Sequence, residues 1–73
     1  MTTEVQAHIT GTVWKVLVKP GDSVASEQVL VILESMKMEM PVEAPEAGTV
    51  VSVAVAEGAS VDEGDVLVTL ETA

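Results

Sequence analysis

The sequence predicts an all-β fold: two four-stranded antiparallel sheets packed as a flattened barrel or sandwich, a barrel-sandwich hybrid with pseudo-two-fold symmetry. Three observations support this fold class. Valine, isoleucine and threonine dominate the chain, glycine with polar residues interrupts it every eight to twelve positions, and the sequence repeats itself once. A chain of 73 residues can form one core. We therefore expect a single domain over residues 1–73.

The repeat appears when the sequence is shifted by 37 residues, which gives 13 identities over the 24 positions from Gly11 to Glu34. Two copies are too few for a solenoid, so the halves are expected to close on each other. The segment from Met36 to Val42 has no clean counterpart in this alignment. Unmatched residues in a repeat are candidates for function.

The strands follow from local patterns. Two short continuous apolar runs, Val29 to Leu33 and Val66 to Leu70, predict buried strands. Valines 13, 16 and 18 recur at 50, 53 and 55, and this uneven spacing predicts a β-bulge near Trp14-Lys15 and another near Val51-Ser52. The spacing leaves the direction of the Trp14 side chain open. Glycine-containing turns are expected at Pro20-Gly21-Asp22, Glu57-Gly58-Ala59 and Glu63-Gly64-Asp65.

Composition excludes several classes of function. Twelve acidic residues against three lysines give a net charge of −9, which repels nucleic acid and anionic lipid surfaces. No apolar run approaches the roughly 18 residues of a membrane span. Cysteine is absent and no leader opens the chain, so we expect a cytoplasmic protein. We also expect the chain to be a monomer in isolation.

The chemistry is expected at a hairpin. The strand from Val29 to Glu34 enters the unmatched segment, and a second strand of about Met38 to Ala44 leaves it. Ser35 to Met38 then form the turn, with Lys37 at its apex. A lysine amine has an ordinary pKa of about 10.4, so only about one in a few thousand is neutral at pH 7. Acylation of Lys37 thus needs an activated acid and a second enzyme, and the lysine is predicted to be a substrate for modification.

The methionines beside this lysine have two interpretations. Met36, Met38 and Met40 alternate as the buried face of a strand does. Methionines on both sides of a lysine at a turn would also give it an adaptable apolar surface that a modifying enzyme could recognise. Lys15 and Lys19 lack such neighbours, and we expect them to be ordinary solvated residues.

The segment Glu34-Ser35-Met36-Lys37-Met38-Glu39 resembles the biotinylation motif of biotin carrier domains. The resemblance covers nearly the whole chain, although those domains usually have alanine at the position of Ser35. It implies that a biotin protein ligase attaches biotin covalently to Lys37 through biotinyl-adenylate. Met36 and Met38 would be recognition neighbours of the attachment site, and Glu34 and Ser35 would flank the motif.

The same resemblance implies a biotin carboxyl carrier. The biotin would take a carboxyl group at a biotin carboxylase and deliver it at a carboxyltransferase, as in acyl-CoA carboxylases, and the carrier would catalyse neither step. Some members of the family carry a protruding loop that is too long for the ten residues between Val18 and Val29. The chain is most similar to free-standing small biotin/lipoyl attachment proteins.

Three alternatives remain open at the level of sequence. A lipoyl carrier shares the expected fold, but it typically flanks its lysine with aspartate and alanine, so lipoate is the less favoured cofactor. The chain could also be an unmodified interaction module or a hydrolase fragment. His8 is expected in the first strand, where a satisfied or exposed histidine is favoured over a catalytic base. Asp62 to Asp65 lack the spacing of a calcium loop, so no metal is expected.

Overall fold

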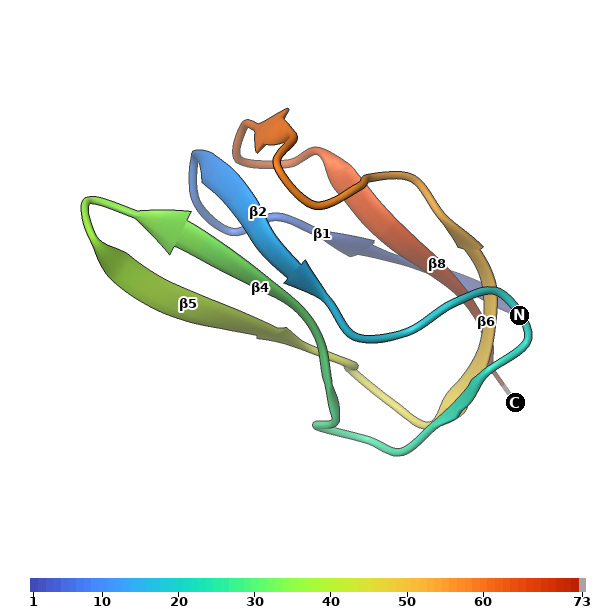
Figure 1. Cartoon of the computed structure of the whole chain (residues 1–73). Helices are drawn as coiled ribbons and strands as arrows, with labels where there is room; N and C mark the ends of the chain where they lie inside the picture. Colours follow the sequence, from blue (N-terminus) through green and yellow to red (C-terminus); the bar gives the residue numbers. More distant parts are fainter. Residues whose placement is uncertain (73) are drawn as a thin grey trace.

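A computed structural model describes residues 1–72, and all of their regular structure is β-strand (Figure 1). The eight strands are β1 Thr2–Gln6, β2 Gly11–Val16, β3 Ser23–Val24, β4 Val29–Ser35, β5 Met38–Glu43, β6 Gly48–Val53, β7 Ser60–Val61 and β8 Val66–Thr72. The predicted second strand of the hairpin therefore ends one residue earlier than expected. His8 lies in the turn after β1, so its prediction within the first strand is wrong.

The strands form two four-stranded antiparallel sheets, which confirms the predicted fold class. Sheet A has the order β1-β8-β6-β3 and sheet B the order β5-β4-β2-β7. No strand pairing joins the two sheets within residues 1–72, so the fold is a sandwich and not a closed barrel. The buried side chains of both sheets form one hydrophobic core.

The sequence repeat is visible in the sheet order. A shift of 37 residues turns β1, β8, β6 and β3 into β5, β4, β2 and β7, which is the order of the other sheet. Each sheet takes two strands from each half of the chain, so the halves interlock. Strand β5 is the counterpart of β1, with Val42 in the position of Val5. The prediction that all of Met36 to Val42 is unmatched is therefore wrong: the part from Met38 onward belongs to β5, and Met36 and Lys37 lie outside the paired strands.

The core depends on the two central strands of the sheets. In both β4 and β8, three of the first five residues are buried, and Leu33 and Leu70 are 0% exposed. The predicted bulges are confirmed, because the pairing register shifts between Val13 and Lys15 and between Val50 and Ser52. The extra residue in each half keeps the following valines against the core.

Tight turns connect the strands. Gly21, Gly58 and Gly64 have φ values of 96°, 92° and 93°, which confirms the predicted glycine turns. Glu27 occupies the place that Gly64 has in the other half, and its φ of 69° is also left-handed. The side-chain oxygens of Asp22, Gln28 and Asp65 accept hydrogen bonds from backbone amides across their turns, at 2.8–3.0 Å.

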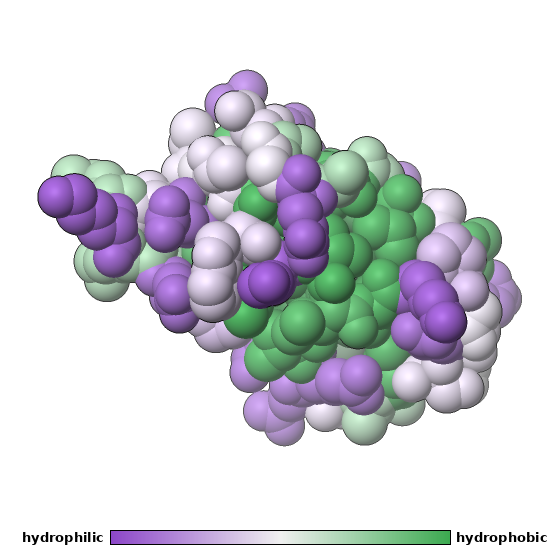
Figure 2. Space-filling view, viewed as in Figure 1, coloured by the Kyte–Doolittle hydropathy of each residue, from purple (hydrophilic) through white to green (hydrophobic). Residues whose placement is uncertain are grey.

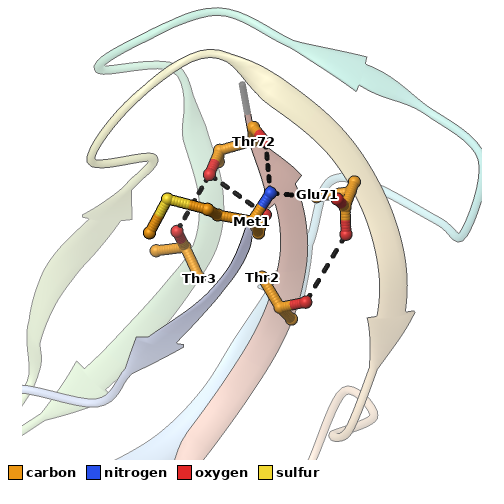
Figure 3. A network of polar contacts seen from close by, with 5 residues as sticks. All are labelled: Met1, Thr2, Thr3, Glu71 and Thr72. Carbon is orange, nitrogen blue, oxygen red and sulfur yellow. Dashed lines mark hydrogen bonds and ion pairs between the residues drawn. The ribbon is translucent and has the colours of Figure 1, made fainter.

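The two ends of the described chain meet at one end of the molecule (Figures 1 and 3). The amine of Met1 donates hydrogen bonds to Oε1 of Glu71, at 3.1 Å, and to the carbonyl of Thr72, at 2.8 Å. The hydroxyl of Thr72 donates to the carbonyl of Met1, at 3.1 Å. These contacts extend the β1–β8 ladder to its last residues, at the opposite end from the β4–β5 hairpin (Figure 1).

Candidate functional site

Strands β4 and β5 form a hairpin whose connection has two residues. The turn was predicted over Ser35 to Met38; in the structure Ser35 pairs with Met38 as the last residues of the strands, so Met36 and Lys37 alone form the connection. The pairing continues through Glu34 with Glu39 and Leu33 with Met40. Because Leu33 is fully buried and Met40 packs against the core, the base of the hairpin is anchored in the sandwich. Lys37 is thus mounted on a rigid two-stranded support.

The turn has an unusual backbone. The φ angles of Met36 and Lys37 are 53° and 66°, and a two-residue hairpin with both central residues at positive φ is a type I′ turn. Such turns favour asparagine and glycine, since a left-handed conformation costs other residues roughly 1–2 kcal/mol each. Residues that retain such strain are concentrated at functional sites. The strained conformation falls on Lys37 and its neighbour.

The side chains at the turn face solvent. Lys37 is exposed, Met36 is 91% exposed and Met38 is 61% exposed, whereas Met40 is partly buried against the core. Figure 2 shows this end of the molecule as a narrow protrusion of hydrophilic and weakly hydrophobic residues, while strong hydrophobic colour gathers over the middle of the view. The three methionines therefore have different roles. Met40 stabilises the fold, whereas Met36 and Met38 are available to a partner.

Among residues 1–72, no carboxylate forms an ion pair with Lys37. Within residues 1–72 the one ion pair joins the Met1 amine to Glu71, far from the hairpin. Glu34 and Glu39 are exposed and directly opposite each other across the hairpin. Like charges at such cross-strand positions repel each other. The Lys37 nitrogen is left accessible, and the surface on which it stands is acidic.

Gly11 determines how closely β2 can approach the base of this hairpin. A Cβ atom at Gly11 would lie 2.6 Å from the carbonyl oxygen of Glu34 and 3.4 Å from Cβ of Ser35. The first distance is shorter than a carbon–oxygen contact allows. Only glycine lets β2 lie against the end of β4 just before the turn. Gly11 therefore helps to position the hairpin.

The other residues considered in the sequence analysis, apart from the motif flank, lie outside the turn that carries Lys37. His8 is exposed in the turn after β1. Lys15 and Lys19 are exposed, and the Lys15 nitrogen lies 5.6 Å from the centre of the Trp14 ring. Trp14, whose direction the sequence left open, is the extra residue of the β2 bulge and is 42% exposed. Glu34 and Ser35 lie on β4 immediately before the turn, as expected.

Other kinds of site are not seen in the described residues. Residues 1–72 contain no pocket and no group of three or more histidine, cysteine, aspartate or glutamate side chains that could hold a metal. The same residues include no helix of the length and apolarity that a membrane crossing requires.

Two features of the site were not predicted from the sequence. The left-handed Met36 and Lys37 were missed because neither is a residue type that signals positive φ. The role of Gly11 was missed although the glycine recurs as Gly48 in the repeat, because a close backbone approach depends on tertiary structure. The paired recurrence of these two glycines was the one available signal.

Comparisons with known proteins agree with this geometry. Residues 1–70 match the family model described as biotin-requiring enzyme. The biotin/lipoyl attachment protein of Bacillus subtilis is 50% identical over 44 residues, which is 60% of this chain and 58% of that protein. A biotinylated protein TB7.3 homolog of Mycobacterium leprae is 50% identical over 44 residues, 60% of this chain and 62% of that protein. The aligned segment thus spans at most about three fifths of these relatives.

Solved structures show the same fold. The urea carboxylase of Kluyveromyces lactis superimposes with a TM-score of 0.91 and 30% identity, over 97% of this chain and 6% of that chain. A single-chain, multi-domain long-chain acyl-CoA carboxylase superimposes with a TM-score of 0.88 and 36% identity, over 99% of this chain and 7% of that chain. On its sequence, its fold and its exposed hairpin lysine, the chain belongs to the biotin-requiring enzyme family as a biotin carrier domain.

Proposed function

We propose that Lys37 is the residue to which biotin is attached, and that residues 1–73 act as one carrier domain. One observation carries this assignment: Lys37 is the exposed second residue of a strained type I′ turn, between two exposed methionines. The other lysines lack this setting. Lys15 is on β2 beside a tryptophan ring, and Lys19 is in a turn closed by Asp22.

The proposed reaction at Lys37 is an acyl transfer. The lysine nitrogen forms an amide bond with the carboxyl carbon of biotin as the bond from that carbon to the AMP phosphate oxygen breaks and AMP leaves. The ammonium group gives up two of its three protons, to solvent or to a base on the ligase, and the amide nitrogen keeps the third. The chain provides neither an activated acid nor a pocket that could hold one within residues 1–72. A biotin protein ligase is therefore the first partner in this proposal.

Bound biotin supplies the chemistry of accepting and delivering a carboxyl group. The chain supplies a rigid hairpin, a flexible lysine stem and an exposed position. Two relatives support this role: the putative urea carboxylase of Emericella nidulans, 50% identical over 42 residues, and the methylmalonyl-CoA carboxyltransferase 1.3S subunit of Propionibacterium freudenreichii, 53% identical over 36 residues. The proposed partners are a biotin carboxylase and a carboxyltransferase, with the chain itself non-catalytic and cytoplasmic.

The assignment is tested by incubating the protein with a purified biotin protein ligase, biotin and ATP, and measuring intact mass and capture on streptavidin. We expect one biotin per chain in the wild type and in Lys15→Ala and Lys19→Ala, and none in Lys37→Ala. The three variants should have the same melting temperature as the wild type, because all three side chains are exposed. Undiminished labelling of Lys37→Ala would exclude Lys37. Lipoylation instead of biotinylation in the native cells would favour the lipoyl carrier.

A further inference from the structure

The outer faces of the two sheets occupy equivalent positions in the repeat but differ in chemistry. In sheet A, one row across three strands consists of Ser52, Thr69 and Glu4. The equivalent row in sheet B, at a shift of 37 residues, consists of Lys15, Ile32 and Pro41. The sheet that carries the Lys37 hairpin therefore has apolar residues at two positions where the other sheet has threonine and glutamate.

These side chains face away from the core. Ile32 lies between Val31 and Leu33, which are both 0% exposed, so strand alternation directs it outward. Pro41 is exposed and lies between Met40 and the buried Val42. Next to this row, the β2 bulge presents Trp14 at 42% exposure. Trp14, Ile32 and Pro41 form what we call the sheet B patch.

The fold does not require this patch. Sheet A has the same strand order and the same register with Thr69 and Glu4 in the equivalent positions. Pro41 has a separate structural reason, since proline on the edge strand β5 discourages pairing with other chains. Ile32 is on a central strand and Trp14 is in a bulge, so edge protection explains neither of them. An exposed tryptophan beside an outward isoleucine is typical of a protein-binding surface.

We propose that the sheet B patch is the docking surface for the enzyme that acylates Lys37, an inference that rests on the proposed function. The patch lies on the strands that carry the lysine. At about 3.3 Å per residue, Pro41 is roughly 10 Å along β5 from Met38. An interface of standard size, about 800 Å² on each partner, covers both the turn and the patch. An enzyme that must reach the Lys37 nitrogen itself therefore contacts both.

The border of the patch defines the complementary surface. Glu39 and Glu43 flank Pro41 on the outer side of β5, and Glu34 lies opposite Glu39. The partner should present an apolar centre bordered by lysine or arginine. The net charge of −9 adds a longer-range attraction to such a surface.

The test replaces the patch with residues that the fold already accepts. In W14V/I32T, each side chain becomes the one found at the equivalent position of sheet A, where Val51 and Thr69 stand. The matched control is Val51→Thr, which removes an exposed apolar side chain from the bulge of the other sheet. Initial rates of biotinylation by a purified biotin protein ligase are measured while the concentration of the carrier is varied. Melting curves identify any folding defect, and the single variant Ile32→Thr provides a second test.

We expect the KM for the carrier to rise about tenfold or more in W14V/I32T, with kcat and the melting temperature nearly unchanged, and Val51→Thr to match the wild type. An unchanged KM, a fall in kcat alone, or an equal rise of KM in Val51→Thr would each overturn the proposal. A failure of the proposed function can be distinguished from a failure of the docking proposal. Long incubation at high carrier concentration should label W14V/I32T fully on Lys37, and labelling of Lys37→Ala would exclude that site whatever the KM.

Discussion

The two ends of the sandwich are built from equivalent strand pairs with different connections. Glu34 pairs with Glu39 at the hairpin end, and the equivalent Glu71 pairs with Thr2 at the end where the chain termini lie. The registers coincide along the strands, including the irregularity near the inner end of each pair. Met36 and Lys37 link the strands at the first end, and hydrogen bonds of Met1 and Thr72 hold them at the other.

This difference separates what the fold needs from what the function needs. The strand pair at the terminal end stays in register without a turn, so the left-handed turn is not required for pairing. At the terminal end, the Met1 amine and the Thr2 hydroxyl both donate to the carboxylate of Glu71. At the hairpin end, Glu34 and Glu39 face each other. The hairpin therefore carries backbone strain and charge repulsion that its counterpart avoids.

The largest expected effect tests whether both halves support one core. Leu33→Ala and Leu70→Ala remove equivalent side chains that are each 0% exposed. Each should lower the free energy of unfolding by about 3 kcal/mol. Urea denaturation of both variants checks this. If one variant were as stable as the wild type, the two halves would not share the core equally.

Alanine substitutions at Gly11 and Gly48 should distinguish an effect on stability from an effect on biotinylation. A Cβ atom would lie 2.6 Å from the Glu34 carbonyl oxygen at Gly11 and 2.5 Å from the Glu71 carbonyl oxygen at Gly48. Alanine should therefore cost about 2 kcal/mol at either position, because backbone must shift. Only Gly11→Ala displaces the hairpin, so it should slow biotinylation at temperatures where both variants are folded. Equal labelling rates would show that Gly11 does not position Lys37.

A smaller effect concerns one pair of turns. Gly64 has a φ of 93°, and Glu27, at the equivalent position, has a φ of 69°. Gly64→Ala should destabilise the protein by about 1 kcal/mol because a side chain is strained in this conformation. Glu27→Gly should stabilise it by about 0.5 kcal/mol, since relief of strain exceeds the added freedom of the unfolded chain. Thermal melting measures both, and a lower melting temperature for Glu27→Gly would contradict the assignment of strain.

The smallest effect concerns the turn itself. Asparagine tolerates left-handed backbone better than methionine does. Met36→Asn should therefore raise the free energy of unfolding by no more than about 0.5 kcal/mol. Lys37 should still be labelled, because its position in the turn is unchanged, while the loss of an exposed methionine should lower the labelling rate. A labelling rate equal to that of the wild type would remove Met36 from the recognition surface.

Much of the fold could be predicted because its signals are local. The bulges at Trp14 and Val51 followed from valine spacing, and the glycine turns followed from residue type. The equivalence of β1 and β5 was missed because those strands share a single identity, Val5 with Val42. His8 was misplaced because the end of a strand depends on pairing with β8, which stops at Gln6.

The hairpin site was predictable in outline and not in its physical detail. Position and residue type predicted Lys37 as the attachment site, because it lies where two predicted strands meet, and the structure places it in the turn between β4 and β5. The division between the exposed Met36 and Met38 and the partly buried Met40 depends on which residues the turn removes from the strand alternation. The sheet B patch could be recognised only from the strand register, which could not be predicted from the sequence.

The most direct test of the central claim is to locate the modification on the protein isolated from its native cells. Fragmentation mass spectrometry of the intact chain and of its peptides reads both the mass of any attached group and the residue that carries it. Biotin on Lys37, with Lys15 and Lys19 unmodified, is the result we predict. Biotin on another lysine, or an unmodified Lys37 in cells whose other biotin proteins are labelled, would contradict the assignment.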